Sequence, residues 1–214
     1  MTPGTRFPLL PLLTLLAIVA TTDGRVAGQR TTAYGIKGGL ARATLDTEFA
    51  GEFDLGQQYR TGLDAGIFLE WLGPRFAILN EVHYIRKGML TEEVLTDSSG
   101  TVIGTAEYGD RLDYLSFPLL ARLAYGSGMV RYYLVAGPRI DLLVGFKTAR
   151  YGLLYTEFPP LCLGADVGVG LEIAGWLLLE ARYSHDITVA YKSDFEKIKN
   201  RSLQFLLGLR VSRR

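Results

Sequence analysis

The tripeptide Ser184-His185-Asp186 contains the three residue types of a hydrolytic triad. A serine nucleophile needs a histidine base within hydrogen-bond reach, and triads are recognised by their geometry and not by their order in the chain. On a β-strand, neighbouring side chains point to opposite faces, so Ser184 and His185 would not meet. Any catalytic role of His185 would require partners on adjacent strands. We therefore expect no catalytic residues and expect the chain not to be an enzyme.

Metal and cofactor chemistry also finds little support in the residue types. The two histidines are not at ligand spacing, and Cys162 is the single cysteine, which excludes an intramolecular disulfide and a thiolate cluster. The glycines from Gly164 to Gly170 sit at period two with no helix after them, unlike a phosphate-binding loop. We expect no metal and no cofactor, and infer that these glycines make room for larger neighbours such as Arg139 or Arg182.

A larger candidate group consists of charged residues that alternate with apolar ones. Two roles are open for them: a salt-bridged plug, which we favour because charges in a narrow interior must be paired, and a proton or ion path. His83 and Glu81 are two residues apart and could form a hydrogen-bonded pair with a structural role. The full inward-facing polar cluster is Lys37, Asp64, Glu70, Glu81, His83, Arg139, Asp141, Asp166, Glu172, Glu180, Arg182 and Arg210.

The elements that must position these residues are β-strands. Between Leu161 and Ile173 every second residue is apolar, and those in between are small or acidic, apart from Cys162. Prolines and glycines break any long helical pattern, so we expect an all-β chain. The expected strands cover 33–45, 59–71, 75–87, 111–124, 130–143, 161–173, 176–186 and 200–212, lengths that suit a tilted crossing of a membrane.

The connections between these strands alternate in length. Short turns are expected at 72–74, 125–129 and 174–175. This alternation is typical of an outer-membrane barrel, with short turns on the periplasmic side and long loops outside. We therefore predict an eight-stranded antiparallel up-and-down transmembrane β-barrel in a bacterial outer membrane, too narrow for general diffusion. The long loops, which could contact a protein partner, are 46–58, 88–110, 144–160 and 187–199.

The beginning of the chain has the layout of a secretory signal peptide, with Arg6 followed by the apolar run Leu9 to Ala20. We expect residues 1–28 to be removed and residues 29–214 to form the barrel domain; the alternative is an uncleaved anchor. Removing residues 1–28 takes away two basic residues and one acidic residue, so the mature chain is neutral. A neutral chain without a basic segment makes nucleic acid an unexpected partner.

Aromatic residues occur near the ends of the expected strands. Rings at these depths would form the girdles that mark the two membrane interfaces, although ordinary core packing is the alternative. The residues concerned are Tyr34, Tyr59, Trp71, Phe76, Tyr84, Tyr114, Tyr125, Tyr132, Trp176 and Tyr183.

Five short motifs resemble the PorT-like outer-membrane β-barrel family. They are Tyr34-Gly-Ile-Lys-Gly-Gly-Leu, Glu81-Val-His-Tyr-Ile-Arg-Lys-Gly, Leu112-Asp-Tyr-Leu-Ser-Phe-Pro-Leu-Leu, Tyr133-Leu-Val-Ala-Gly-Pro and Asp166-Val-Gly-Val-Gly-Leu-Glu. The resemblance implies a signal peptide, an eight-stranded barrel and an association with protein secretion, and it supplies no catalytic residues. The chain departs from the usual barrel ending, because no aromatic residue stands at the C-terminus.

Three functions remain open from the sequence. The favoured one is a structural or interaction role through the external loops; the resemblance adds a link to export or surface assembly. The loop 88–110 is acidic, with Glu92, Glu93, Asp97, Glu107 and Asp110, and we expect it to be exposed. The alternatives are a lipid-modifying outer-membrane enzyme acting around His185 or His83, and a secreted soluble barrel that binds an apolar ligand.

Overall fold

The computed structural model describes residues 33–48, 57–147, 159–188, 191–192 and 197–213. The expected signal peptide, residues 1–28, lies outside them. Among the described residues, no helix is long and apolar enough to cross a membrane. The strands are β1 (Ala33–Glu48), β2 (Gln57–Leu72), β3 (Phe76–Thr96), β4 (Val102–Tyr125), β5 (Val130–Lys147), β6 (Leu161–Ile173), β7 (Leu177–Asp186), β8 (Tyr191–Lys192) and β9 (Lys197–Arg213).

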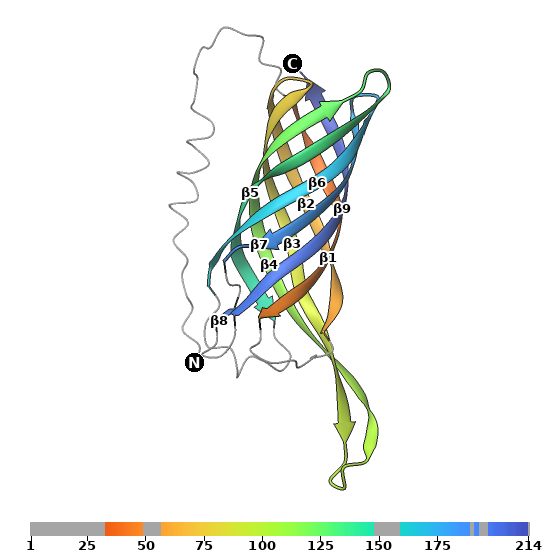
Figure 1. Cartoon of the computed structure of the whole chain (residues 1–214), viewed down its shortest axis with the longest axis vertical. Coiled ribbons are helices and arrows are strands. Elements are labelled where there is room, and N and C mark those ends of the chain that lie inside the picture. Colours follow the sequence, from red (N-terminus) through yellow and green to blue (C-terminus); the bar gives the residue numbers. More distant parts are fainter. Residues whose placement is uncertain (1–32, 49–56, 148–158, 189–190, 193–196, 214) are drawn as a thin grey trace.

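The strands close into a barrel (Figure 1). Each strand from β1 to β7 pairs antiparallel with the next, β7 pairs with β9, and β9 returns to β1, where Leu40 stands opposite Phe205. The two-residue β8 pairs only with the beginning of β9 among the described strands. The barrel wall therefore has eight strands, and the predicted eight-stranded antiparallel barrel is confirmed.

One expected loop is wrong. The segment 88–110, expected as a long loop, consists mostly of the outer parts of β3 and β4, which pair from Gly88 opposite Arg111 to Thr96 opposite Val102. Its β-branched residues favour extended backbone, and the carboxylate of Asp97 closes the turn by accepting hydrogen bonds from the amides of Ser99 (2.9 Å) and Thr101 (2.9 Å). Of the acidic residues in this segment, Asp97 is exposed as expected, and the segment is a paired ribbon and not a loop.

Strands also reach into the other three expected loops. β1 continues to Glu48 and β2 starts at Gln57, β5 continues to Lys147, and β9 starts at Lys197. Residues 49–56, 148–158, 189–190 and 193–196 of these loops lie outside the described residues. The connections at the other end are short, as expected. We call the end with the turns 73–75, 126–129 and 174–176 the short-turn end, and the opposite end the hairpin end (Figure 1).

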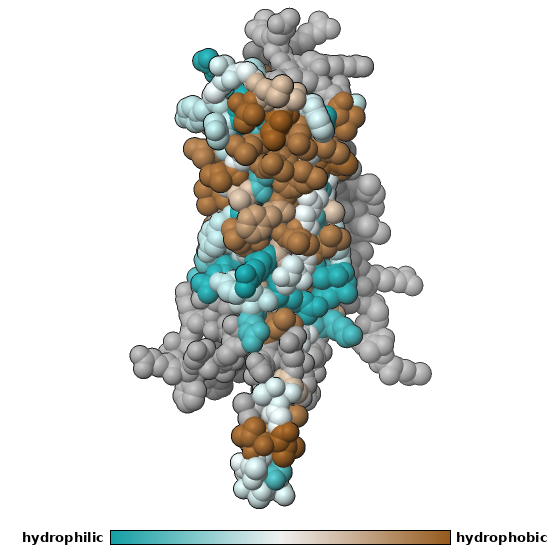
Figure 2. All heavy atoms as spheres, turned by 90° about the vertical axis from the view of Figure 1, so that its right-hand side faces the viewer, coloured by the Kyte–Doolittle hydropathy of each residue, from teal (hydrophilic) through white to brown (hydrophobic). Residues whose placement is uncertain are grey.

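The two faces of the wall differ sharply in chemistry. On β6, Val167 is 55% exposed on the outside of the barrel, whereas Asp166 and Glu172 are buried inside at 3% and 0%. Figure 2 shows apolar side chains gathered in a broad band across the face of the wall that it presents. A polar interior and an apolar exterior are the reverse of a soluble barrel with an apolar pocket, so that alternative is wrong.

Most of the expected girdle aromatics point outward. Exposed rings include Tyr34, Phe76, Tyr125, Tyr132 and Trp176 toward the short-turn end, and Tyr59 and Tyr183 toward the hairpin end, while Trp71 and Tyr84 are half-buried. Tyr114 is the exception and the girdle assignment is wrong there. Its ring is 1% exposed inside the barrel, because Tyr114 has the same parity on β4 as the inward-facing Ser116 and Arg122.

Candidate functional site

The structure places all twelve charged residues of the predicted cluster inside the barrel, each with 7% exposure or less. Three further buried charges, Lys87, Arg122 and Asp186, join them. Lys87 has the same parity as His83 on β3, and Asp186 the same parity as Arg182 on β7, so period two could have located both. We call the resulting set of ion pairs the interior network, and it forms three layers along the barrel axis.

The first layer lies at the short-turn end. Arg122 Nη1 is 2.6 Å from Glu70 Oε1, and Arg210 Nη2 is 2.6 Å from Glu70 Oε2. Glu172 is shared by Arg122, Arg131 and Arg210, the last at 3.1 Å. Arg210 also donates a hydrogen bond to the carbonyl oxygen of Gly175 (2.5 Å) in a short turn. Three cations around two carboxylates therefore link the strands next to the short turns.

The second layer lies around the middle of the barrel. Lys37 Nζ contacts Glu81 Oε1 at 2.6 Å and Glu180 Oε2 at 2.8 Å. Arg182 contacts the same two carboxylates, Glu81 at 2.8 Å and Glu180 at 2.8 Å through Nε. The hydroxyl of Tyr133 donates a hydrogen bond to Glu180 (3.0 Å). The layer joins β1, β3, β5 and β7 across the interior.

His83 belongs to the second layer and lies between two carboxylates. Its Nδ1 is 2.5 Å from Asp64 Oδ1, and its Nε2 is 3.2 Å from Glu81 Oε2, the second contact without hydrogen-bond geometry. A neutral imidazole has one ring nitrogen that accepts, which would face a carboxylate oxygen unfavourably. The surroundings therefore favour the doubly protonated imidazolium. The predicted pairing of His83 with Glu81 is present, but Asp64 is the closer partner.

The third layer lies toward the hairpin end and centres on Arg139. Its guanidinium contacts Asp166 at 2.6 Å and Asp141 at 3.0 Å, and also pairs with Asp186. Lys87 Nζ lies 2.7 Å from Asp141 and 3.7 Å from Asp186. One arginine thus holds three carboxylates together, with one lysine to share the charge.

The charges of the three layers almost balance. The carboxylates are Asp64, Glu70, Glu81, Asp141, Asp166, Glu172, Glu180 and Asp186, and the cations are Lys37, Lys87, Arg122, Arg131, Arg139, Arg182 and Arg210. A protonated His83 makes the two sets equal. Paired charges that occupy the interior are the arrangement of a plug, because unpaired charges would carry a large desolvation cost.

Small residues on the wall make space for large side chains in the interior. A Cβ atom on Gly164 would lie 2.5 Å from Arg139 Nη2, and one on Gly170 would lie 2.2 Å from the ring of Tyr133. The inferred role of the glycines in admitting Arg139 therefore has a direct geometric basis at Gly164. At Gly168 the nearest atom is the carbonyl oxygen of Ala181, at 2.8 Å, and the side chain of Arg182 is not among its closest neighbours.

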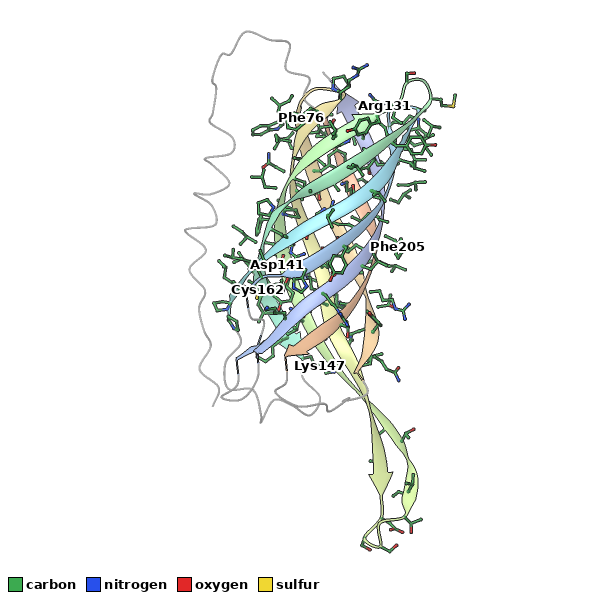
Figure 3. All side chains as sticks on the ribbon, viewed as in Figure 1. Phe76, Arg131, Asp141, Lys147, Cys162 and Phe205 are labelled. Carbon is green, nitrogen blue, oxygen red and sulfur yellow. The ribbon has the colours of Figure 1, made fainter. Side chains whose placement is uncertain are left out.

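The triad-like residues are separated as strand geometry requires. Ser184 is buried and accepts a hydrogen bond from Gln204 Nε2 (2.8 Å), whereas His185 lies on the outward face and its ring stacks near Tyr183 at 6.4 Å. In the described part of the chain, no three His, Cys, Asp or Glu residues are grouped so that they could hold a metal ion. Cys162 is buried inside the wall and is unpaired (Figure 3).

A second candidate site is the ribbon formed by the outer halves of β3 and β4. β2 pairs with β3 as far as Gln57 opposite Thr91, and β5 pairs with β4 as far as Arg111 opposite Lys147. Among the described residues, the two strands beyond these points pair only with each other. We call residues 92–107 the hairpin, and Figure 1 shows it projecting from the barrel.

Comparisons with known proteins agree with this geometry. A family model described as an outer membrane protein β-barrel domain matches residues 27–191. Neisserial surface protein A has a similar structure, with a TM-score of 0.44 and 15% identity over 82% of this chain and 96% of that chain. OprG from Pseudomonas aeruginosa has a TM-score of 0.46 and 11% identity, over 87% of this chain and 99% of that chain. Ail of Yersinia pestis, solved with sucrose octasulfate, has a TM-score of 0.44 and 13% identity, over 83% of this chain and 99% of that chain. At these values the likenesses indicate no ligand or activity for this chain. No curated protein matches it.

Proposed function

Because the chain belongs to the outer membrane protein β-barrel domain family, we propose that it is an integral outer-membrane scaffold whose external hairpin binds a protein partner. The localisation and the transmembrane barrel follow from the family and the fold. The binding role is the proposal, and the hairpin is the single observation that carries it. The closed, ion-paired interior supports a scaffold and not a general diffusion pore.

The hairpin has the shape and the surface of a recognition element. On β4, residues 102–110 lie beyond the last pair with β5, so the hairpin and its base extend roughly 30 Å at about 3.3 Å per residue. Val102 and Ile103 near its tip are 62% and 66% exposed, and Leu95 is 37% exposed. Figure 2 shows an apolar patch on the projecting hairpin, separated from the membrane-facing band by a hydrophilic zone. An apolar patch outside the membrane favours a protein partner.

The turn at the tip is held firmly, which favours binding without a large ordering cost. Asp97 Oδ1 accepts hydrogen bonds from the Ser99 hydroxyl (2.6 Å) and from two backbone amides, and the Asp97 amide donates to the carbonyl oxygen of Thr101 (2.9 Å). A β-ribbon whose edges pair with no other described strand, and whose tip is fixed, suits the addition of a partner's strand. The sequence of the segment is acidic, so a partner with basic residues around an apolar pocket fits best.

The proposal is tested by photo-crosslinking in living cells. A photoreactive amino acid at position 103 is expected to give an adduct of one defined mass, and the same amino acid at Phe76, an exposed position at the short-turn end, is expected not to give that adduct. Replacing Val102 and Leu95 by serine should weaken the adduct without changing the heat-modifiable migration of the barrel. Absence of an adduct at 103, or the same adduct from both positions, would refute hairpin recognition.

We further propose the finer placement among the PorT-like barrels, with a role in protein export or surface assembly. Support comes from the order of the motifs that begin at Tyr34, Glu81, Leu112, Tyr133 and Asp166. Loss of the protein should then reduce the amount of secreted or surface-assembled protein, and a chain without the hairpin should not restore it. Full restoration by that shortened chain would separate the export role from the hairpin.

We also propose that the chain has no catalytic activity. The separation of Ser184 from His185 by the barrel wall supports this, as does the engagement of both ring nitrogens of His83 by carboxylates. The test is the lipid composition of cells that express the protein, measured by mass spectrometry beside the His83→Ala and His185→Ala variants. A lipid change that depends on either histidine would establish the lipid-modifying alternative.

A further inference from the structure

A compact group of charges lies on the outside of the barrel wall, where the hairpin leaves it. Asp113 accepts from Arg111 Nε (2.8 Å) and lies 2.6 Å from Arg111 Nη2, and it also accepts from Arg86 Nε (3.1 Å). Tyr84 lies beside them, with its hydroxyl 3.5 Å from Arg86 Nη2. Lys147 stands opposite Arg111 on β5. We call these five residues the outer arginine cluster.

The cluster faces outward and is accessible. Arg86 lies between Ile85 and Lys87, both buried inside the barrel, so its own side chain points to the outer surface. The side chains of Arg86 and Arg111 are 32% and 35% exposed, while Asp113 between them is 12% exposed. Figure 3 shows Lys147 at the hairpin end of the wall, and Phe76 and Arg131 at the other end.

The position of the cluster matches the outer edge of the lipid bilayer. On β4 the outward residues run from Tyr125 through Leu123 and Leu119 to Leu115 without a charge, and Asp113 and Arg111 follow immediately. This uncharged stretch covers residues 115–125, and a strand of about 9–11 residues crosses the hydrocarbon core. The charges therefore begin where the lipid headgroups begin. Because the short turns mark the periplasmic side, these headgroups belong to the outer leaflet.

The charges of the cluster do not cancel. Arg86 and Arg111 contact the carboxylate of Asp113, and Lys147 stands opposite Arg111, so the five residues together carry a net charge of +2. Asp113 engages Nε of both guanidinium groups, and each guanidinium has further N–H donors. The single carboxylate of Asp113 does not neutralise the two guanidinium groups, so the remaining positive charge attracts a further anion, and the arginine fork matches the oxygens of a phosphate.

The basic character continues around the wall. Arg42 on β1 is exposed, with its guanidinium 4.8 Å from the centre of the Tyr59 ring. Figure 2 shows a hydrophilic zone directly beyond the apolar band on this side of the barrel. A surface with an arginine above a girdle tyrosine is suited to the boundary between acyl chains and headgroups.

We propose that the outer arginine cluster is a binding site for a phosphate group of an anionic lipid headgroup in the outer leaflet. Arg86 and Arg111 donate to the phosphate oxygens, Asp113 holds the two guanidinium groups in place, and Lys147 adds charge. The site rests on the location of the barrel in the outer membrane and not on the partner proposed for the hairpin. It would anchor the base of the hairpin to the membrane surface.

The experiment uses the full mature chain in detergent micelles, with native mass spectrometry to count bound lipid. The lipids are diphosphorylated lipid A and the same lipid with both phosphates removed. The wild type is expected to retain the phosphorylated lipid preferentially. Each arginine near a charged membrane surface contributes to the affinity for anionic lipid. The variant Arg86→Gln/Arg111→Gln, which lacks two of them, should therefore bind the phosphorylated lipid roughly thirtyfold more weakly. The variant Arg86→Lys/Arg111→Lys keeps the charge but loses the fork, and an intermediate loss is expected.

The matched control is Arg75→Gln, which removes an exposed arginine at the short-turn end and should leave binding unchanged. All variants must keep heat-modifiable migration, which separates loss of the site from loss of the fold. Competition by inorganic phosphate would assign the site to phosphate in general, and lack of competition would assign it to phosphate carried by a lipid; both support the site. Equal binding of the dephosphorylated lipid, or equal losses in Arg75→Gln and Arg86→Gln/Arg111→Gln, would overturn the proposal.

Discussion

Replacing Arg139 by methionine tests the interior network at the residue that pairs with the most carboxylates in the third layer. Arg139 lies between Asp141, Asp166 and Asp186, and it is 2% exposed. Without it, Lys87 remains 2.7 Å from Asp141 and 3.7 Å from Asp186, and the nearest cation to Asp166 is Arg182 at 3.7 Å. Three buried carboxylates would then share one close lysine.

Breaking a buried ion pair by removing one partner costs about 3–5 kcal/mol, because the remaining charge stays buried without compensation. We expect Arg139→Met to lower the free energy of unfolding by about 4 kcal/mol, roughly a thousandfold in the ratio of folded to unfolded protein. In an Asp166→Asn background the same substitution should cost less, by about 1 kcal/mol or more, since one uncompensated charge is gone.

The assay is equilibrium unfolding in urea of protein refolded into lipid vesicles, followed by tryptophan fluorescence and by heat-modifiable migration. Arg75→Met, at an exposed position, is the control and should change stability by less than about 0.5 kcal/mol. A loss below about 1 kcal/mol for Arg139→Met, or a loss equal to that of the control, would refute the view that paired charges hold the interior together.

Three further predictions follow from single contacts. Gly170→Ala should cost about 1–3 kcal/mol in urea unfolding, because its Cβ would lie 2.2 Å from the Tyr133 ring, whereas Gly104→Ala, with no atom within 4 Å, should not destabilise; equal stabilities would contradict the close fit. Hydrogen bonds from Ser99, and then the Thr101 amide, hold the pKa of Asp97 below its ordinary value of 3.8, so the hairpin turn should stay ordered above pH 3.8 and loosen as pH falls further. Hydrogen exchange measured in intact protein and in Asp97→Ala checks this, and a turn that exchanges equally in both would count against it. Cys162 is 1% exposed, so a charged maleimide should label it only after unfolding, and rapid labelling of the folded barrel would contradict its inward position.

Much of the fold could be predicted from the sequence because the side-chain period of a strand is two. That period located the twelve inward charges, and it also places Tyr114 inside with Ser116, whereas the girdle expectation considered only the place of Tyr114 near a strand end. The two-residue period gives no signal where the residues on both faces of a strand are apolar. Arg122 has the inward neighbours Leu120 and Ala124, at 0% and 6% exposure, so the alternation around it carried no signal.

The partners of the inward charges could not be predicted in the same way. Lys37 meets Glu180 across 143 residues of sequence, and this contact depends on the strand tilt and stagger that closure of the barrel imposes. The hairpin was missed for a different reason. Its two strands pair with each other beyond the barrel wall. There they do not separate lipid from a polar interior, so their sequences lack the apolar alternation from which the other strands were predicted.

Electrical recording in planar bilayers tests most directly the central claim, that paired side chains fill the barrel interior and leave it closed. Heat-modifiable wild-type protein in concentrated KCl should give no steady current steps above the bare lipid, because side chains of the interior network occupy the three layers of the lumen. Reproducible steps that vanish when the same protein is denatured would show an open path and contradict the account.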